Sequence, residues 1–192
     1  VINEPSAVIN AADFYGQVAF VKAADFLMNN CNENTYAIIG YKLNNTLSEH
    51  GTVSRGECEV DANNNLVTIT ERTKIGKNKS GEIIFEDGDN KVMLASDATV
   101  SMNFWGFHQN VFNLTKNLFT QFVAEQQQNL KAEYFIPIIA DEFIKEEGKT
   151  INVIPTSAQW FGVTYKEDAP AVKASLDKLL KANIYPDNLW NV

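Results

Sequence analysis

Apolar residues along the chain fall into short runs separated by helical patterns, which indicates an α/β fold. The first run, residues 7–9, is typical of a buried strand, and it ends shortly before an acid, Asp13. A helical pattern follows over residues 17–30, with apolar positions at Phe20, Ala24, Leu27 and Met28. A second apolar run, residues 35–41, is typical of a parallel strand. The opening of the chain therefore predicts a βα unit followed by another strand.

Alternating polar and apolar positions in the middle of the chain predict two β-hairpins. In the first, strands over 52–60 and 65–72 flank a turn of Asp, Ala and two Asn residues, types that suit tight hairpin turns. In the second, strands over 82–86 and 91–95 flank another such turn. The lysine-rich stretch 73–81 between the hairpins predicts a flexible surface loop, with anion contact as the less favoured reading.

The second half of the chain predicts a strong strand, two helices, two short strands and a last helix. In order, these elements cover residues 99–107, 110–130, 137–147, 151–154, 160–165 and 168–183. The strand over 99–107 places Asn103 and Trp105 on one face. We expect a tail over 185–190 to pack against the rest. The whole pattern predicts one domain, residues 1–192, with a mixed sheet flanked by helices and carrying inserted β-hairpins.

Composition excludes several classes of partner. The 192 residues carry a net charge of -8, and no cluster of Lys and Arg could neutralise a nucleic-acid backbone. Cys31 and Cys58 are far apart and form no CxxC motif, which favours a reducing, cytoplasmic setting over a disulfide framework or a zinc site. The sequence contains no run of eighteen apolar residues, so it predicts no membrane-spanning helix.

Asp13 is the first candidate for chemistry, because ligands of open α/β sheets bind outside the carboxyl ends of the strands. A carboxylate at that place suits a divalent cation and phosphate oxygens, although many such acids only cap the next helix. Other catalytic patterns are absent from the sequence. His50 and His108 are isolated, Ser54 lies in GTVSRG and not in a nucleophile elbow, and no GxGxxG or GxxxxGK loop occurs.

Four ordered blocks resemble the sugar-nucleotide nucleotidyltransferases, which join a nucleoside triphosphate to a sugar 1-phosphate and release pyrophosphate. The blocks are VINAADFYG, EHGTVSRGECEVDANNNLVTITERTKI, SMNFWGF and IPTSAQWFGVTYKED. The resemblance covers almost the whole chain and matches the later part of the family domain. It implies a partial GT-A or Rossmann-like mixed sheet.

The resemblance also implies roles for individual residues. Asp13 would bind Mg²⁺, and Asp13 and Arg72 would be the catalytic residues, with the planar guanidinium of Arg72 holding the sugar phosphate. The implied substrate-binding residues are Gly51, Glu71, Arg72, Asn103 and Trp105. The implied substrates are a sugar 1-phosphate and a nucleoside triphosphate.

Three departures from the family pattern leave the activity open. Ala12 stands where the family places the first acid of its metal motif, and Gly162 stands where many relatives have a second acid. The front of the family domain, with its glycine-rich triphosphate loop, has no counterpart here. Two hypotheses therefore stand together: a nucleotidyltransferase, or a non-catalytic remnant that binds a sugar phosphate or serves in assembly.

The lack of a counterpart to the front of the family domain also predicts an association between chains. Val8 and Ile9 would then lie on a strand edge that lacks a neighbour, and an unpaired edge is a template for another chain. We therefore expect a homo-oligomer or completion by a separate polypeptide.

Overall fold

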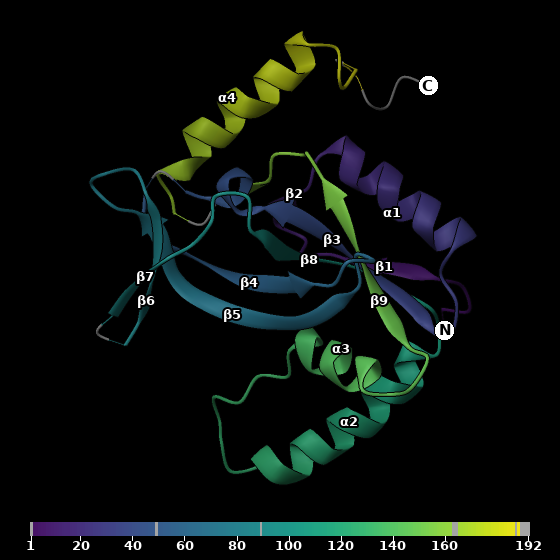
Figure 1. Ribbon diagram of the computed structural model, residues 1–192. Helices are drawn as coiled ribbons and strands as arrows, with labels where there is room; N and C mark the ends of the chain where they lie inside the picture. Colours follow the sequence, from purple (N-terminus) through teal and green to yellow (C-terminus); the bar gives the residue numbers. More distant parts are fainter. Residues whose placement is uncertain (1, 49, 89, 163–164, 187, 189–192) are drawn as a thin grey trace.

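The computed structural model describes residues 2–48, 50–88, 90–162, 165–186 and 188 (Figure 1). Within them the main sheet has eight strands, in the order β7-β6-β5-β4-β8-β3-β9, with β1 paired to β8 as well. The strands are β1 (Ser6–Val8), β3 (Thr35–Lys42), β4 (Val53–Val60), β5 (Leu66–Lys77), β6 (Ile83–Asp87), β7 (Asn90–Met93), β8 (Thr99–Phe107) and β9 (Thr150–Thr156). A second, two-stranded sheet joins β2 (Asp13–Phe14) to β10 (Phe161–Gly162).

Helices cover both faces of the main sheet (Figure 1). The α-helices are α1 (Gln17–Asn29), α2 (Val111–Gln126), α3 (Ile136–Ile144) and α4 (Asp168–Lys181), and η1 (Leu43–Thr46) is a short 3₁₀ turn. In the figure α1 and α4 lie on one side of the sheet, and α2 and α3 lie on the other. None of the helices in the described ranges is long and apolar enough to cross a membrane.

Each face of the sheet has its own hydrophobic core. One core contains Ala19 and Ala23 of α1 together with Phe104 of β8. The other contains Ile139 and Phe143 of α3, with further side chains from β3, β8 and β9. Strand residues that are successive in sequence point to opposite faces, so β8 supplies large side chains to both cores. The expected mixed α/β fold is confirmed, with a sheet that is mostly antiparallel; β3 and β9 form its parallel pair.

The basic stretch is more regular than predicted. β5 continues through Lys77, and Gly76 and Lys77 pair with Ile84 and Ile83 of β6. The prediction of a flexible loop over 73–81 was therefore wrong for its first five residues. Hydrogen bonding to the neighbouring strand stabilises an extended backbone there, in spite of the Gly and Lys residues that disfavour strands.

Helix α1 packs through a different face from the one predicted. The buried residues are Ala19, Ala23 and Phe26, whereas Met28 is 76% exposed and Phe20 is partly exposed. The helix is apolar on two faces, so its periodicity alone did not determine which face would meet the sheet. Met28 remains exposed, whereas the ring of Phe20 lies 6.3 Å from that of Tyr15 and 5.1 Å from that of Phe104, centre to centre.

Strand β1 is an edge strand and not a buried one. It pairs with β8 through Ser6, Ala7 and Val8, and no other strand of the described residues pairs with it. Val8 and Ile9 are 41% and 40% exposed. The predicted burial of this run was therefore wrong, because β8 is the one strand of the described residues that pairs with β1. The predicted strand over 160–165 and the predicted tail over 185–190 lie partly outside the described residues.

The second core should be a main source of stability. Phe143 is fully buried and stacks on Tyr36, with ring centroids 3.7 Å apart. Phe143→Ala should lower the free energy of unfolding by about 3–5 kcal/mol, because it leaves a cavity where the ring lay. Urea denaturation followed by circular dichroism measures the change. Leu130→Ala is the control, since Leu130 is 99% exposed, and equal losses in the two variants would contradict this account of the core.

Candidate functional site

A polar pocket of about 270 Å³ lies where β4, β5 and β8 meet the segment between β1 and β2. Its charged and amide-bearing lining residues are Asn10, Asp13, Arg55, Glu71 and Asn103, and the rest of the lining is Ser54, Gly56, Ile69, Ser101, Met102, Pro137 and Trp160. The structure therefore brings together three residues singled out in the sequence: Asp13, Glu71 and Asn103. Small-molecule sites in proteins are commonly roughly 300–1,000 Å³, so this pocket lies just below that range and suits a small ligand.

Asp13 is held in place by the segment that carries it. Its Oδ2 accepts a hydrogen bond from the side-chain amide of Asn10 at 3.0 Å and lies 3.3 Å from the hydroxyl of Tyr15. That hydroxyl accepts from the backbone N–H of Asn10 at 3.0 Å and lies 2.8 Å from the carbonyl oxygen of Met102 on β8. Tyr15 is buried, so it fixes the approach of Asp13 to β8.

Glu71 and Asn103 reach the pocket from β5 and β8. Asn103 has φ of 56°, a left-handed conformation that Asn adopts more readily than most residues, and its backbone N–H donates to the hydroxyl of Ser101 at 3.1 Å. The β3–β8 register shifts between Ile38 and Gly40, opposite this part of β8. Irregularities of this kind commonly re-aim side chains near functional sites.

Arg55 and Trp160 complete the pocket, and neither was predicted from the sequence to be a site residue. The guanidinium carbon of Arg55 lies 4.7 Å from the centre of the Trp160 ring, and the two residues are only 9% and 7% exposed. Nη1 of Arg55 donates to the carbonyl oxygen of Ser54 at 2.7 Å, and Nη2 donates to that of Thr46. One signal was present: Arg55 lies two residues after Val53 in an alternating strand, at a position that predicts an inward-facing side chain.

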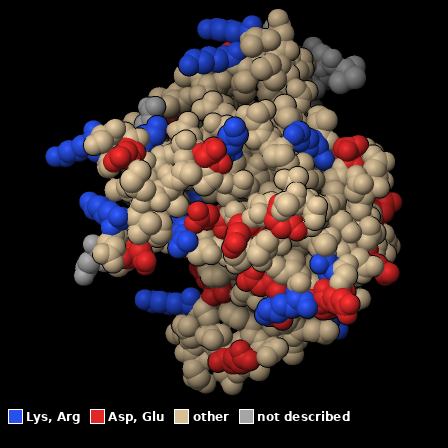
Figure 2. Space-filling view, in the orientation of Figure 1, with Lys and Arg blue, Asp and Glu red and all other residues tan. Residues whose placement is uncertain are grey.

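Burial perturbs the charged groups of this pocket. It lowers the pKa of the Arg55 guanidinium to about 10, against the opposing influence of Asp13 and Glu71, so Arg55 remains protonated at neutral pH. Burial raises the pKa of the Glu71 carboxyl, and Arg55 partly offsets that effect. With Asp13 and Glu71 ionised, one positive and two negative groups line the pocket. Figure 2 shows acidic side chains across the middle of one face of the molecule and many basic ones near its outline.

Three residues that the sequence predicted for the site lie elsewhere. Arg72 does not line this pocket: its Nε pairs with Glu57 at 2.9 Å and its guanidinium lies over Phe85. Trp105 is fully buried in the core under α2 and α3. Gly51 lies against the ring of Tyr165, where an added Cβ would come within 2.5 Å of the ring.

The place of the second family acid is next to Asp13, but it leaves no room for a side chain. Gly162 pairs with Asp13 across the small β2–β10 sheet. A Cβ at Gly162 would lie 2.3 Å from the indole of Trp160 and 3.3 Å from Oδ1 of Asp13. The indole of Trp160 thus takes the space that a second carboxylate side chain would need.

The residues around Asp13 offer a magnesium ion few protein ligands. No group of three or more His, Cys, Asp or Glu side chains suited to a metal occurs in the described part of the chain. Asp13 keeps Oδ1 available beside Gly162, since the bond from Asn10 goes to Oδ2. Mg²⁺ is commonly bound through one or two carboxylates together with phosphates of the substrate, so Asp13 suffices only when a ligand supplies further oxygens.

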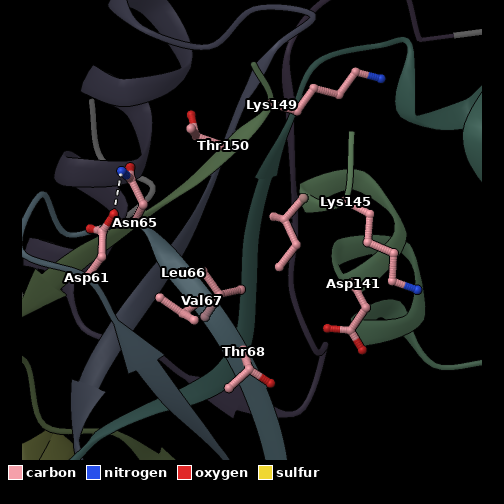
Figure 3. Close-up of a pocket in the computed structure, with 10 residues that line it drawn as sticks. Asp61, Asn65, Leu66, Val67, Thr68, Asp141, Lys145, Lys149 and Thr150 are labelled. Carbon is pink, nitrogen blue, oxygen red and sulfur yellow. Dashed lines mark hydrogen bonds between the residues drawn. The ribbon is translucent and has the colours of Figure 1, made fainter. Parts of the chain in front are cut away.

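A larger hollow of about 600 Å³ lies between the β4–β5 turn and α3 (Figure 3). Three of its four ionic lining residues, Asp61, Lys145 and Lys149, are engaged within the protein, and the fourth is Asp141. Asp61 accepts hydrogen bonds from Asn63 and Asn65 of its own turn, and Lys145 and Lys149 pair with Glu142 and Glu146. We therefore assign the candidate site to the smaller pocket, where Arg55 forms no ion pair with any residue that the structure describes.

Comparison with known proteins supports the fold. No family model and no curated protein matches the sequence. Among solved structures, a protein assigned as a glucose-1-phosphate thymidylyltransferase from Bacillus anthracis, crystallised with sucrose, matches with a TM-score of 0.51 at 12% identity, over 90% of this chain and 55% of that one. A mannose-1-phosphate geranyltransferase from Thermus thermophilus matches with a TM-score of 0.39 at 12% identity, over 83% and 47%. The chain thus has a nucleotidyltransferase-like fold and spans about half the length of these proteins.

The raised pKa of Glu71 predicts how the site affects stability. The folded protein binds a proton at Glu71 more readily than the unfolded chain does, so stability falls as the pH rises from about 4.3 through the raised pKa. Glu71→Gln removes this cost, so it should raise the melting temperature at pH 7.5 and have less effect at pH 4.

Thermal denaturation of wild type and variant at both pH values measures the difference. Glu86→Gln is the control, because Lys74 lowers the pKa of that exposed carboxyl and the variant should gain no stability. A lower melting temperature for Glu71→Gln at pH 7.5 would contradict a raised pKa of the Glu71 carboxyl in the folded protein.

Proposed function

We propose that this chain binds a sugar 1-phosphate in the pocket formed by Asp13, Arg55, Glu71 and Asn103. The observation that carries the proposal is the meeting of Asp13 with Glu71 and Asn103, which come from three separate segments of the chain, in one small pocket. The nucleotidyltransferase-like fold adds support. The leading activity is transfer of a nucleotidyl group from a nucleoside triphosphate to the sugar 1-phosphate, with release of pyrophosphate.

The chemistry of the lining suits a hydroxyl-rich ligand with one anionic group. The Glu71 carboxylate accepts hydrogen bonds from sugar hydroxyls, and the Asn103 amide both donates and accepts them. Arg55 supplies the positive charge near the anionic group. Binding of this kind positions and orients the reacting phosphate, which is most of what nucleotidyl transfer requires of a protein.

Asp13 is the residue that would hold Mg²⁺ in the proposed activity. When bound, the ion would neutralise charge that develops on the phosphate oxygens. The hydrogen bond from Asn10 orients Asp13, and Tyr15 fixes its loop against β8. Ala12 and Gly162 contribute no carboxylate, so a divalent ion would depend on the phosphates of the substrates for its remaining ligands.

The second candidate is a protein that binds a sugar phosphate without turning it over. Two observations favour it: Trp160 fills the space beside Gly162, and the described pocket is too small for a triphosphate together with a sugar. Both candidates use the same residues for the sugar phosphate, so one pair of measurements separates them.

Calorimetry and a pyrophosphate assay should be run side by side on the intact chain. The panel combines glucose, mannose and galactose 1-phosphates with ATP, CTP, GTP, UTP and dTTP, in the presence of Mg²⁺. We expect at least one sugar 1-phosphate to bind, and Asp13→Asn to abolish any release of pyrophosphate. Binding without release would select the non-catalytic candidate, and no binding by any of the three sugar phosphates would contradict the proposed function.

We also propose that the chain associates with a second copy through α1 and the edge of β1. Exposed apolar side chains there are Val8 of β1, Ile9 directly after it, and Val18, Val21 and Met28 of α1. An apolar surface is a suitable place for two chains of net charge -8 to meet. The edge of β1 that no described strand pairs with adds backbone donors and acceptors that a partner strand could satisfy.

Light scattering after size exclusion should therefore give a mass above that of one chain. Val21→Asp together with Met28→Lys should reduce the mass to that of a monomer, because each substitution places a charge in the apolar contact. Phe112→Asp, on the exposed side of α2, is the control and should leave the mass unchanged. A wild-type protein that is monomeric and melts cooperatively would contradict this proposal.

A further inference from the structure

Two of the buried polar groups that line the candidate pocket have no hydrogen-bond partner. They are Nε of Arg55 and Nε1 of Trp160, and both are inaccessible N–H groups. Two other buried groups in the described residues share this property, the indole N–H of Trp105 and the hydroxyl of Tyr134, and neither lines this pocket. Buried donors are nearly always paired in native proteins. The two unpaired donors belong to residues that lie against each other, with the guanidinium carbon of Arg55 4.7 Å from the centre of the Trp160 ring, so they call for an acceptor.

The charge of Arg55 is also unmatched at close range. None of the ion pairs in the described ranges includes Arg55, and its hydrogen bonds go to two backbone carbonyl oxygens. Asp13 and Glu71 act on it only through longer-range attraction. A guanidinium offers five N–H donors in one plane, so several remain for a ligand after these two bonds.

From these observations we propose that Arg55 and Trp160 form an oxyanion seat that binds the phosphate group of the ligand without a metal ion. A phosphate oxygen accepts from Nε of Arg55 and another accepts from Nε1 of Trp160, after a small shift of side chains that opens the buried wall of the pocket. Asp13 and Glu71 would repel a bare anion, whereas the hydroxyls of a sugar donate to these carboxylates. The seat therefore favours a phosphate that is carried on a sugar.

This inference rests on the proposed function, and it changes the residue that holds the phosphate. The resemblance in sequence gave that role to Arg72, which lies outside the pocket and pairs with Glu57. The chain has only these two arginines. Arg55→Gln and Arg72→Gln are therefore a matched pair that makes the same chemical change at the two sites.

Calorimetry in EDTA and a buffer free of phosphate tests the seat with three probes: glucose 1-phosphate, glucose and inorganic phosphate. Wild type should bind glucose 1-phosphate at least tenfold more tightly than glucose. Arg55→Gln should lower the affinity for glucose 1-phosphate roughly ten- to a hundredfold, the range for a hydrogen bond to a charged group. Its affinity for glucose should stay within twofold of the wild-type value. Arg72→Gln should change none of these affinities by more than twofold.

Two further variants separate a ligand contact from a structural role. Arg55→Lys keeps the positive charge and should retain part of the preference for the phosphate. Trp160→Phe keeps an aromatic ring for the guanidinium but removes the N–H, and should weaken glucose 1-phosphate roughly two- to tenfold with glucose unchanged. Circular dichroism checks that each variant is folded; if Arg55→Gln is not, Trp160→Phe decides, and an unchanged affinity would overturn the seat.

The remaining outcomes are also decisive. Equal loss of phosphate binding in Arg55→Gln and Arg72→Gln, or a preference for the phosphate that appears only with Mg²⁺, would overturn the proposal, as would a wild type that binds no phosphate compound. If inorganic phosphate binds through Arg55 and a sugar adds no affinity, the oxyanion seat is supported and the proposed function is contradicted. If glucose 1-phosphate binds equally well to wild type and to Arg55→Gln, the proposed function is supported and the seat is overturned.

Discussion

The pairing of β8 with three other strands is the constraint on which the candidate site depends. β8 pairs with β3 along one side, and with β1 and β4 at different places along the other. The pocket lies where these pairings change, so Asn103 of β8, Arg55 of β4 and the segment that follows β1 meet there. The Tyr15 hydroxyl, 2.8 Å from the carbonyl oxygen of Met102, fixes that segment to β8. A rigid sheet therefore positions side chains from distant parts of the sequence.

The charged groups of the pocket lower the stability of the folded chain, and the hydrophobic cores around them offset that loss. Among the residues that the structure describes, Arg55 is buried without an ion pair, and burial raises the pKa of Glu71, so both ionised groups reduce the stability of the folded chain. The two cores on either side of the sheet supply the hydrophobic stabilisation that makes this tolerable. Perturbed ionisable groups commonly mark functional sites, which is consistent with a site that is stabilised further by its ligand.

Sequence patterns predicted the elements better than their surroundings. The strand Thr99–Phe107 and the first strand and turn of the first hairpin were predicted almost residue by residue, because alternation and turn residues are local signals; β5 continues five residues past its predicted end. The burial of α1 and β1 was predicted wrongly. The pattern of a helix with two apolar faces, or of a short apolar strand, does not determine which neighbour covers it. The convergence of Asp13 with Glu71 and Asn103 followed from the resemblance, while Arg55 was missed because its role depends on its burial beside Trp160. Arg72 and Trp105 lie outside the pocket because the side-chain directions of β5 and the packing of α2 and α3 determine their surroundings.

A crystal structure of the chain with glucose 1-phosphate tests the central claim most directly. The account predicts the sugar in the pocket between Glu71 and Asn103, with its phosphate within hydrogen-bond distance of Arg55 and Trp160. A ligand bound instead beside Arg72, or in the hollow between the β4–β5 turn and α3, would contradict it.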